Sequence, residues 1–215
     1  MLKRNLTRIS NSSTQIAEAL TDEILQGKLS PAEKLNQGKL AEQFGVSKIP
    51  VREALHRLEA DGLIRFQSNG NATVSELSLE EAEQIYLMRI SLETLLLRHA
   101  GNNLAAVDFV KAENALRLID HEKDAYRWLT LNWEFHLALY GPANLPYVVQ
   151  TLEKLYINSA RYFVVFNILN YRGRSQEEHF GILQASQAGD IDKACVLLEE
   201  HLVASREALF EYLDR

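Results

Sequence analysis

The chain has 215 residues, of which 47% are apolar and 24% are charged, the composition of an ordinary globular protein that is large enough to bury a core. Its single cysteine, Cys195, excludes an intramolecular disulfide and a thiolate metal cluster, and it fits a reducing compartment. The apolar runs are too short to cross a bilayer and the first residues lack the apolar stretch of a secretory signal, so we expect a cytoplasmic protein with no membrane partner.

The net charge of −6 argues against a nucleic-acid partner when the chain is taken as a whole, but this charge is unevenly spread. Residues 1–77 contain 10 Lys and Arg against 9 Asp and Glu, whereas residues 78–215 contain 13 against 20. Such asymmetry indicates two parts with different partners. Ser78 and Glu81 form the S-x-x-E pattern of a capping box, which begins a new helix. We therefore predict two domains, residues 1–77 and residues 78–215.

Three helices are predicted in the first domain, because apolar residues recur there at intervals of three or four and capping residues or glycines mark the ends. The first carries Ile16, Leu20 and Ile24 and stops at Gly27. The second runs from the N-cap Asn36 to Phe44 and ends at Gly45. The third is capped by Ser47, carries Val51, Leu55 and Leu58, and ends at Asp61-Gly62.

Two short strands, residues 63–66 and 72–75, are predicted to follow the third helix. They flank Ser68-Asn69-Gly70-Asn71, which is a strong hairpin-turn sequence. The order of the first domain is therefore helix, helix-turn-helix and β-wing.

The third helix is the expected reading helix, because the second helix of a helix-turn-helix enters the major groove and points its N-terminal residues at base edges. Lys48 and Arg52 are four residues apart on its exposed face, and Arg52 can make a forked contact with guanine or with a phosphate. A winged domain that contacts another protein has the same spacing, so this alternative stays open. The further candidates for contact with DNA are Ser47, His56, Arg57, Arg65 and the wing-tip residues Asn69 and Gly70.

The second domain has no convincing strand, and its helical periodicity predicts about six helices in an antiparallel bundle. The predicted fold class is therefore mainly α, with a small β-wing in the first domain. One of the predicted apolar stripes consists of Ile85, Met88, Leu92 and Leu95.

Three histidines, His136, His179 and His201, lie in apolar stripes of three different predicted helices. A single histidine on an apolar face is usually a hydrogen-bonded core residue. Three that converge in one small bundle can instead bind Zn²⁺, Ni²⁺ or a similar metal. Asn132 precedes His136 by one helical turn, so its side chain shares that face and can add an oxygen ligand.

The sequence from Leu40 to Ile64 contains G-V-S-x-x-P-V-R-E-A-L-x-R-L-E-x-D-G-L, and it resembles the core of the GntR-type winged helix-turn-helix. The resemblance implies a homodimeric transcription factor that binds a palindromic double-stranded operator. The chain departs from the family pattern at Lys48, where Arg is usual, and at Gly38 and Gly70, where basic residues are common. These departures affect the operator sequence more than the activity.

The second domain resembles the FCD ligand domain of the FadR-like subfamily. The segments that carry the resemblance are I-Y-x-x-R-x-x-L-E at 85–93, F-H-x-x-L within 132–139, R-x-x-S-x-x-E-H at 172–179 followed by I-L at 182–183, G-D at 189–190 and H-L at 201–202. The resemblance implies that a divalent metal is held by Asn132, His136, His179 and His201 inside an effector pocket. Open coordination positions would take a small carboxylate metabolite, anchored by a cation such as Arg89.

Asn132 stands where the subfamily usually has Asp. Because an amide is a weaker and neutral ligand, the site either retains metal less well or attracts an anionic effector more strongly. Arg89 and Glu93 form an i, i+4 pair that is open to two interpretations, effector contact or structural ion pairing.

The function that we predict is a ligand-responsive DNA-binding regulator, a repressor rather than an enzyme. Two alternatives remain, a regulator without metal and a metal-dependent hydrolase. The hydrolase lacks support because the sequence has no H-E-x-x-H helix and no carboxylate placed as a general base.

Overall fold

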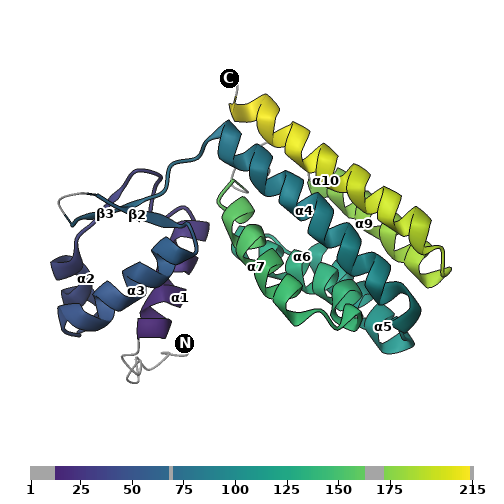
Figure 1. Cartoon of the computed structure of the whole chain (residues 1–215), viewed down its shortest axis with the longest axis horizontal. Helices are drawn as coiled ribbons and strands as arrows, with labels where there is room; N and C mark the ends of the chain where they lie inside the picture. The colour runs from purple at the N-terminus through teal and green to yellow at the C-terminus, as the bar shows by residue number, and fades with distance from the viewer. Residues whose placement is uncertain (1–12, 68–69, 163–171, 214–215) are drawn as a thin grey trace. The chain divides into compact units, whose positions relative to one another are not determined.

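The computed structural model describes residues 13–67, 70–162 and 172–213. The chain forms two compact units that divide between Glu76 and Leu77 (Figure 1). The first is a winged helix-turn-helix, and the described residues of the second form helices and connecting loops without a strand, so the predicted fold class is confirmed.

The helices of the first unit are α1 (Ser13–Leu25), α2 (Gln37–Phe44) and α3 (Lys48–Ala60). At the start of α2, the side chain of Asn36 accepts hydrogen bonds from the amides of Gly38 and Lys39. Gly45 ends α2 with a φ of 66°, a left-handed conformation that glycine adopts without strain. The apolar stripes of α1 and α3 pack against each other, and their predicted core residues are buried: Ile16, Leu20, Ile24, Val51, Leu55 and Leu58.

The wing is part of a three-stranded antiparallel sheet in the order β1-β3-β2. β2 (Ile64–Phe66) pairs with β3 (Ala72–Val74), and Arg65 lies opposite Thr73. The additional strand β1 (Lys34–Leu35), between α1 and α2, pairs with the other edge of β3. The sequence did not predict β1, because a two-residue strand has no period by which it can be recognised.

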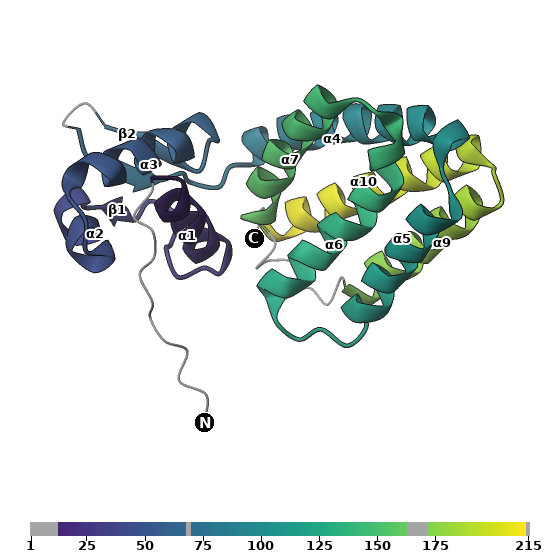
Figure 2. The same ribbon diagram turned by 90° about the horizontal axis from the view of Figure 1, so that it is seen from below.

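The described helices of the second unit are α4 (Leu79–Ala100), α5 (Ala106–Ile119), α6 (Ala125–Tyr140), α7 (Pro146–Ala160), α9 (Arg172–Gln187) and α10 (Ile191–Leu213). Short 3-10 turns, Gly101–Asn103 and Gly141–Ala143, follow α4 and α6. α10 runs beside α4 and α9, and α5 packs along α6 (Figures 1 and 2). Among the described helices, none is long and apolar enough to span a membrane.

The predicted capping box at the start of α4 forms only in part. Ser78 Oγ accepts from the Glu81 amide at 3.1 Å, as expected of an N-cap. The reciprocal bond is replaced, because the amide of Ser78 donates to the hydroxyl of Tyr162 and the carboxylate of Glu81 pairs with Arg161. Tyr162 and Arg161 follow α7, so tertiary contacts override the local motif.

The predicted apolar face of α4 is wrong by about a third of a turn. Met88 and Leu95 are 44% and 39% exposed, whereas the charged pair Arg89 and Glu93 is buried together with Ile85. A buried ion pair is tolerated where other polar groups complete its hydrogen bonds. The face that α4 turns towards the interior of the helical unit is therefore apolar with one charged pair, Arg89 and Glu93, in its middle.

We expect Gly101→Ala to destabilise the second unit by about 1–3 kcal/mol, because the added methyl group overpacks a filled space. A Cβ atom at this position would lie 2.6 Å from Cγ1 of Ile191. Gly141 is a matched control, since it also follows a helix with a similar backbone conformation and a Cβ there meets nothing within 4 Å. Thermal unfolding of the two variants measures the difference, and equal losses would contradict the expected clash.

Candidate functional site

The N-terminal turn of α3 is exposed at the positions that the sequence singled out. Ser47, Lys48 and Arg52 are all on the surface. Ser47 occupies the N-cap position, but its side chain makes no capping hydrogen bond. Pro50, the third residue of the helix, has no amide proton, so one of the two amides that an N-cap side chain usually binds is missing. The Ser47 hydroxyl and the first amides of α3 therefore remain able to bind an anion.

A groove between α3 and the wing brings together residues that are distant in the sequence. It is lined by Gln37, Arg52, His56, Phe66 and Gly70. The His56 ring packs on the Phe66 ring with centroids 4.7 Å apart, so α3 and β2 hold each other at this point. Arg52, His56 and the wing-tip residue Gly70 thus face one space, as expected for a surface that follows a duplex.

Other predicted contact residues do not face this groove. Arg57 donates from Nη1 to Thr14 Oγ1 on α1 at 2.7 Å, which directs it to the neighbouring helix. Arg65 alternates with Phe66 along β2 and therefore points from the other face of the sheet. Asn69 lies outside the described residues.

Ile49, which the sequence analysis passed over, is 70% exposed between Lys48 and Arg52. An apolar side chain at this place can contact the methyl group of a thymine in the major groove. Its neighbour Lys48 extends over Gly38, where an added Cβ would be 3.8 Å from the Lys48 Cε atom.

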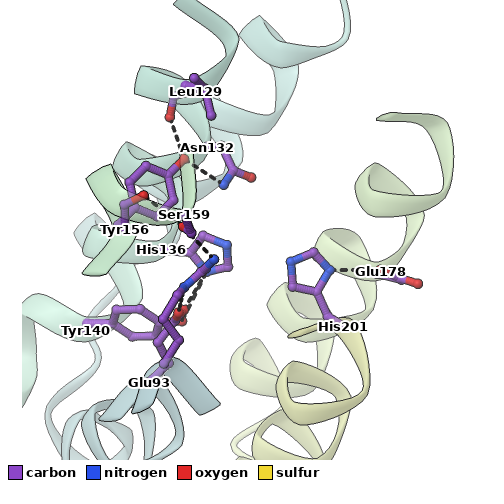
Figure 3. A network of polar contacts seen from close by, with 10 residues as sticks. Glu93, Leu129, Asn132, His136, Tyr140, Tyr156, Ser159, Glu178 and His201 are labelled. Atoms are coloured by element: carbon purple, nitrogen blue, oxygen red, sulfur yellow. Dashed lines mark hydrogen bonds and ion pairs between the residues drawn. The ribbon is translucent and has the colours of Figure 1, made fainter. Parts of the chain in front are cut away.

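The second unit brings His136 of α6, His179 of α9 and His201 of α10 together at its centre. All three are buried, and one ligand atom of each lies within 4.8 Å of the others. The ring centroids are 5.1 Å apart for His136 and His179, and 4.5 Å apart for His179 and His201. The rings of His136 and His201 face each other, with Glu178 on the far side of His201 (Figure 3). The convergence inferred from three separate stripes is present in the structure.

Several polar atoms at this centre are buried and have no hydrogen-bond partner among the described residues. They are Asn132 Oδ1, His136 Nε2 and both ring nitrogens of His179. Leaving such a group unsatisfied costs about 1–3 kcal/mol. A cation bound between these residues removes that cost for Asn132 Oδ1, His136 Nε2 and one nitrogen of His179, because each of these atoms can offer a lone pair to it. The residues therefore fit a metal ion.

The amide of Asn132 is oriented by a tyrosine of α7. Asn132 Nδ2 donates to Tyr156 Oη at 3.0 Å, and Tyr156 Oη donates to the carbonyl of Leu129 at 2.8 Å (Figure 3). Because the nitrogen is engaged, the oxygen is the atom left for a ligand role. Asn132 and His136 lie one turn apart on α6, as the sequence predicted.

His201 and His136 each contact a further side chain through Nδ1. His201 Nδ1 lies 2.8 Å from Glu178 Oε2, and the Glu178 carboxylate also accepts from Arg174. His136 Nδ1 lies 3.0 Å from the hydroxyl of Tyr140, one turn further along α6. Such partners orient metal-binding histidines and raise their basicity. The i, i+4 spacing of His136 and Tyr140 on one helix could have identified Tyr140 from the sequence. Glu178 is adjacent in sequence to His179, and only the fold shows that its partner is His201.

Arg89 lies beside this centre on α4. Its Nε donates to Glu93 Oε1 at 2.8 Å, its Nη1 donates to Ser159 Oγ at 3.1 Å, and Tyr140 Oη donates to Glu93 Oε2 at 2.7 Å. Arg89 also lines a small cavity of about 40 Å³. The structural ion pair that the sequence offered as one interpretation is therefore present. The cavity lining includes Tyr86, Asn132, Tyr156, Ser159 and His201.

Burial dominates the electrostatics of two of the histidines. Loss of solvent, followed by the neighbouring His201 and Arg89, holds the pKa of His136 well below its usual value of 6.5. Loss of solvent and the two neighbouring histidines lower the pKa of His179 in the same way. Both rings are therefore neutral near pH 7, and a neutral imidazole is the form that binds a metal.

Two family models match the chain. "Bacterial regulatory proteins, gntR family" matches residues 12–74 and "FCD domain" matches residues 84–204. The chain belongs to the gntR family of bacterial regulatory proteins and carries an FCD domain. It is a DNA-binding transcriptional regulator, and its families and relatives are regulators rather than enzymes, which confirms the prediction that it is not an enzyme.

Named relatives agree with this assignment. The uncharacterized HTH-type transcriptional regulator YdhC of Bacillus subtilis is 29% identical over 76% of this chain and 73% of its own length. The gluconate operon transcriptional repressor of Bacillus licheniformis is 27% identical over 80% of this chain and 70% of its own length. The solved structure of McbR/YncC from E. coli has a TM-score of 0.81 and covers 96% of this chain and 100% of its own; at 24% identity it supports the fold alone.

We expect the metal-free protein to lose stability as the pH falls below about 6.5. In the unfolded chain His136 and His179 take up protons near their usual pKa of 6.5, but in the folded chain their lowered pKa values keep them neutral. The unfolded state thus binds more protons, so the free energy of unfolding falls on acidification. Thermal unfolding of EDTA-treated protein measures this, and His179→Leu should flatten the dependence.

Proposed function

We propose that the protein acts in the cytoplasm as a homodimeric repressor that binds a palindromic operator. In this proposal a small carboxylate metabolite, bound at a metal site in the FCD domain, modulates operator binding. The observation that carries the sensor part is the group of buried, unpartnered ligand atoms between α6, α9 and α10. Relatives named as repressors support repression rather than activation.

The DNA-binding residues that we propose lie on α3 and the wing. Arg52 is the principal base or phosphate contact, Lys48 contributes a point charge, and Ser47 contributes a hydroxyl that is not used in capping. His56 and Gly70 line the groove beside Arg52 and are placed to contact the backbone of the duplex, whereas Arg65 is exposed on the other face of the sheet and contributes positive charge at longer range. Arg57 is the weakest of the predicted contacts because Thr14 engages its guanidinium group.

The metal ion that we propose is Zn²⁺ or Ni²⁺, held by His136, His179, His201 and the amide oxygen of Asn132. When bound, it supplies a positive centre with open positions for an anionic ligand. All four protein ligands are neutral, so the set leaves the whole charge of the ion uncompensated. This supports a carboxylate effector, which would contribute the missing negative charge. In a metal-free regulator the histidines should instead be hydrogen-bonded pocket walls, but neither ring nitrogen of His179 has a hydrogen-bond partner among the described residues.

Arg89 is the cation that we propose for the effector carboxylate. Its Nε and Nη1 groups are engaged by Glu93 and Ser159, but no hydrogen bond of Nη2 to a described residue is present. The cavity that Arg89 shares with Asn132 and His201 is small, which favours a compact metabolite. Effector contact and ion pairing are thus compatible roles of one side chain.

The exposed face of α4 supports the homodimer. Leu87, Met88 and Leu95 are exposed along one stripe of this helix. Burying apolar surface of this kind against a second copy is the usual driving force of subunit association. Two copies would then present two α3 helices to the two halves of a palindrome.

We expect Arg52→Ala to weaken operator binding by about 1–3 kcal/mol, because a forked contact to DNA is lost. His136→Ala should leave operator affinity without effector unchanged and should alter metal content or effector response. Fluorescence anisotropy with an operator selected from random DNA measures both. Arg57→Ala is the control, since Arg57 is engaged by Thr14 and should lose less affinity. Unchanged affinity of Arg52→Ala at moderate salt would exclude the proposed docking of α3.

Native mass spectrometry of freshly purified protein without a histidine tag should show a dimer, twice the 24.5 kDa of one chain, that carries a divalent metal ion. His136→Ala should reduce the metal occupancy, because one of four ligands is removed. A dimer that is free of metal while its pocket is intact would count against the metal site. A monomer would instead contradict the two-half-site arrangement.

A further inference from the structure

A chain of hydrogen bonds runs from Arg89 through Glu93 and Tyr140 to His136. The direction of these bonds is fixed at the arginine. A guanidinium group can only donate, so Glu93 accepts from Arg89 through Oε1. A carboxylate has no proton to give, so Glu93 also accepts through Oε2, and Tyr140 is the donor. Because the single proton of Tyr140 is directed at Glu93, its oxygen can only accept from His136. The proton of the neutral His136 ring must therefore be on Nδ1.

Burial and the neighbouring Ser159 stabilise this direction of the hydrogen bonds. Arg89, Glu93, Tyr140 and His136 are each at most 5% exposed, so bulk water does not compete for their hydrogen bonds. Ser159 accepts from Arg89 Nη1 and donates its own proton to the carbonyl of Tyr156, which fixes the second arm of the guanidinium group. Among the described residues, Tyr140 is the hydrogen-bond partner of His136 Nδ1, and Nε2 has none.

We propose that Glu93 and Tyr140, oriented by Arg89, are positioning residues that select the tautomer of His136. With the proton on Nδ1, the lone pair of the ring is on Nε2, the buried atom that is left for a metal ion. The metal part of this inference rests on the proposed function, but the selection of the tautomer is a property of the metal-free chain. The same side chain that faces the effector cavity thus determines which nitrogen of a metal ligand is available.

Glu93→Gln has a specific consequence under this proposal. Arg89 can only donate, so the oxygen of the new amide stays at Arg89 and its NH₂ group faces Tyr140. Tyr140 then accepts from the amide and donates to His136 Nδ1. The His136 proton moves to Nε2, which can no longer bind a metal. A substitution that preserves the shape of the side chain therefore reverses the two hydrogen bonds between residue 93 and His136, while the bond from Arg89 is kept.

The direct test is ¹⁵N NMR of the full-length, metal-free protein with ¹⁵N-labelled histidine, at a pH where the rings are neutral. Long-range proton–nitrogen correlation distinguishes a protonated Nδ1 from a protonated Nε2, and the His136 signals are assigned by their absence in His136→Asn. We expect protonated Nδ1 in the wild type and protonated Nε2 in Glu93→Gln. Protonated Nε2 in the wild type, or the same tautomer in both proteins, would overturn the proposal.

The second readout is zinc affinity, measured by competition with a chromophoric chelator. Glu93→Gln and Tyr140→Phe should each weaken zinc binding, by about 10- to 100-fold for a partner of this kind. The double variant should bind zinc no more weakly than Glu93→Gln alone, because without the Tyr140 hydroxyl the reversed amide no longer acts on His136. Losses that multiply would indicate a packing role and contradict the proposal.

Matched controls are available in the same unit. Glu81 is another arginine-paired glutamate of α4, and Tyr162 is another buried tyrosine, with its hydroxyl bonded to Ser78. Glu81→Gln and Tyr162→Phe should leave the His136 nitrogen signals and the zinc affinity unchanged. If the wild type binds no zinc but shows the Nδ1-protonated ring, the proposed metal site fails while the tautomer selection stands. If Glu93→Gln does not fold, Tyr140→Phe still decides, since loss of a single His136 tautomer is expected there.

Discussion

The ion pair between Arg89 and Glu93 is the interaction on which the helical unit depends. Taking two charges out of water is costly, and their mutual attraction compensates only where further hydrogen bonds complete the site. Ser159 and Tyr140 supply those bonds from α7 and α6, so the pair holds three helices in register. The rotation of α4 follows from this arrangement, because the helix turns Arg89 and Glu93 inwards together with its apolar residues and leaves Met88 and Leu95 outside.

Much of the fold was predictable, because its signals are local. The stripes of α1 and α3, the Asn36 cap and the wing turn are short-range patterns, and the histidine stripes of α6, α9 and α10 converge as expected. The errors have a different origin. The rotation of α4, the strand β1 and the incomplete capping box at Ser78 depend on partners that are distant in the sequence. Periodicity assigns charged residues to the surface, and therefore it cannot find a charged pair that is buried.

In the site, too, the metal-ligand candidates were predictable from the sequence and the residues that hydrogen-bond to them were not. The metal-ligand candidates were identified by residue type and by helical spacing. Their partners were not, because Tyr140 resembles a core residue and Glu178 is adjacent in sequence to the wrong histidine. Arg57 is the opposite case, a residue whose type suggested DNA contact and whose guanidinium group turns to Thr14 instead. Chemistry of this kind is fixed by tertiary geometry.

The contact between Arg57 and Thr14 also bears on how the protein responds to ionic strength. Affinity for DNA falls with added salt in proportion to the number of phosphates that a protein neutralises, since each neutralised phosphate releases condensed counterions. Arg57 donates to Thr14 on the surface of α1, so this cation of α3 is held against the neighbouring helix instead of reaching a phosphate. In the proposed docking of α3 the number of phosphates neutralised is then smaller by one, so the affinity for DNA falls less steeply with added salt.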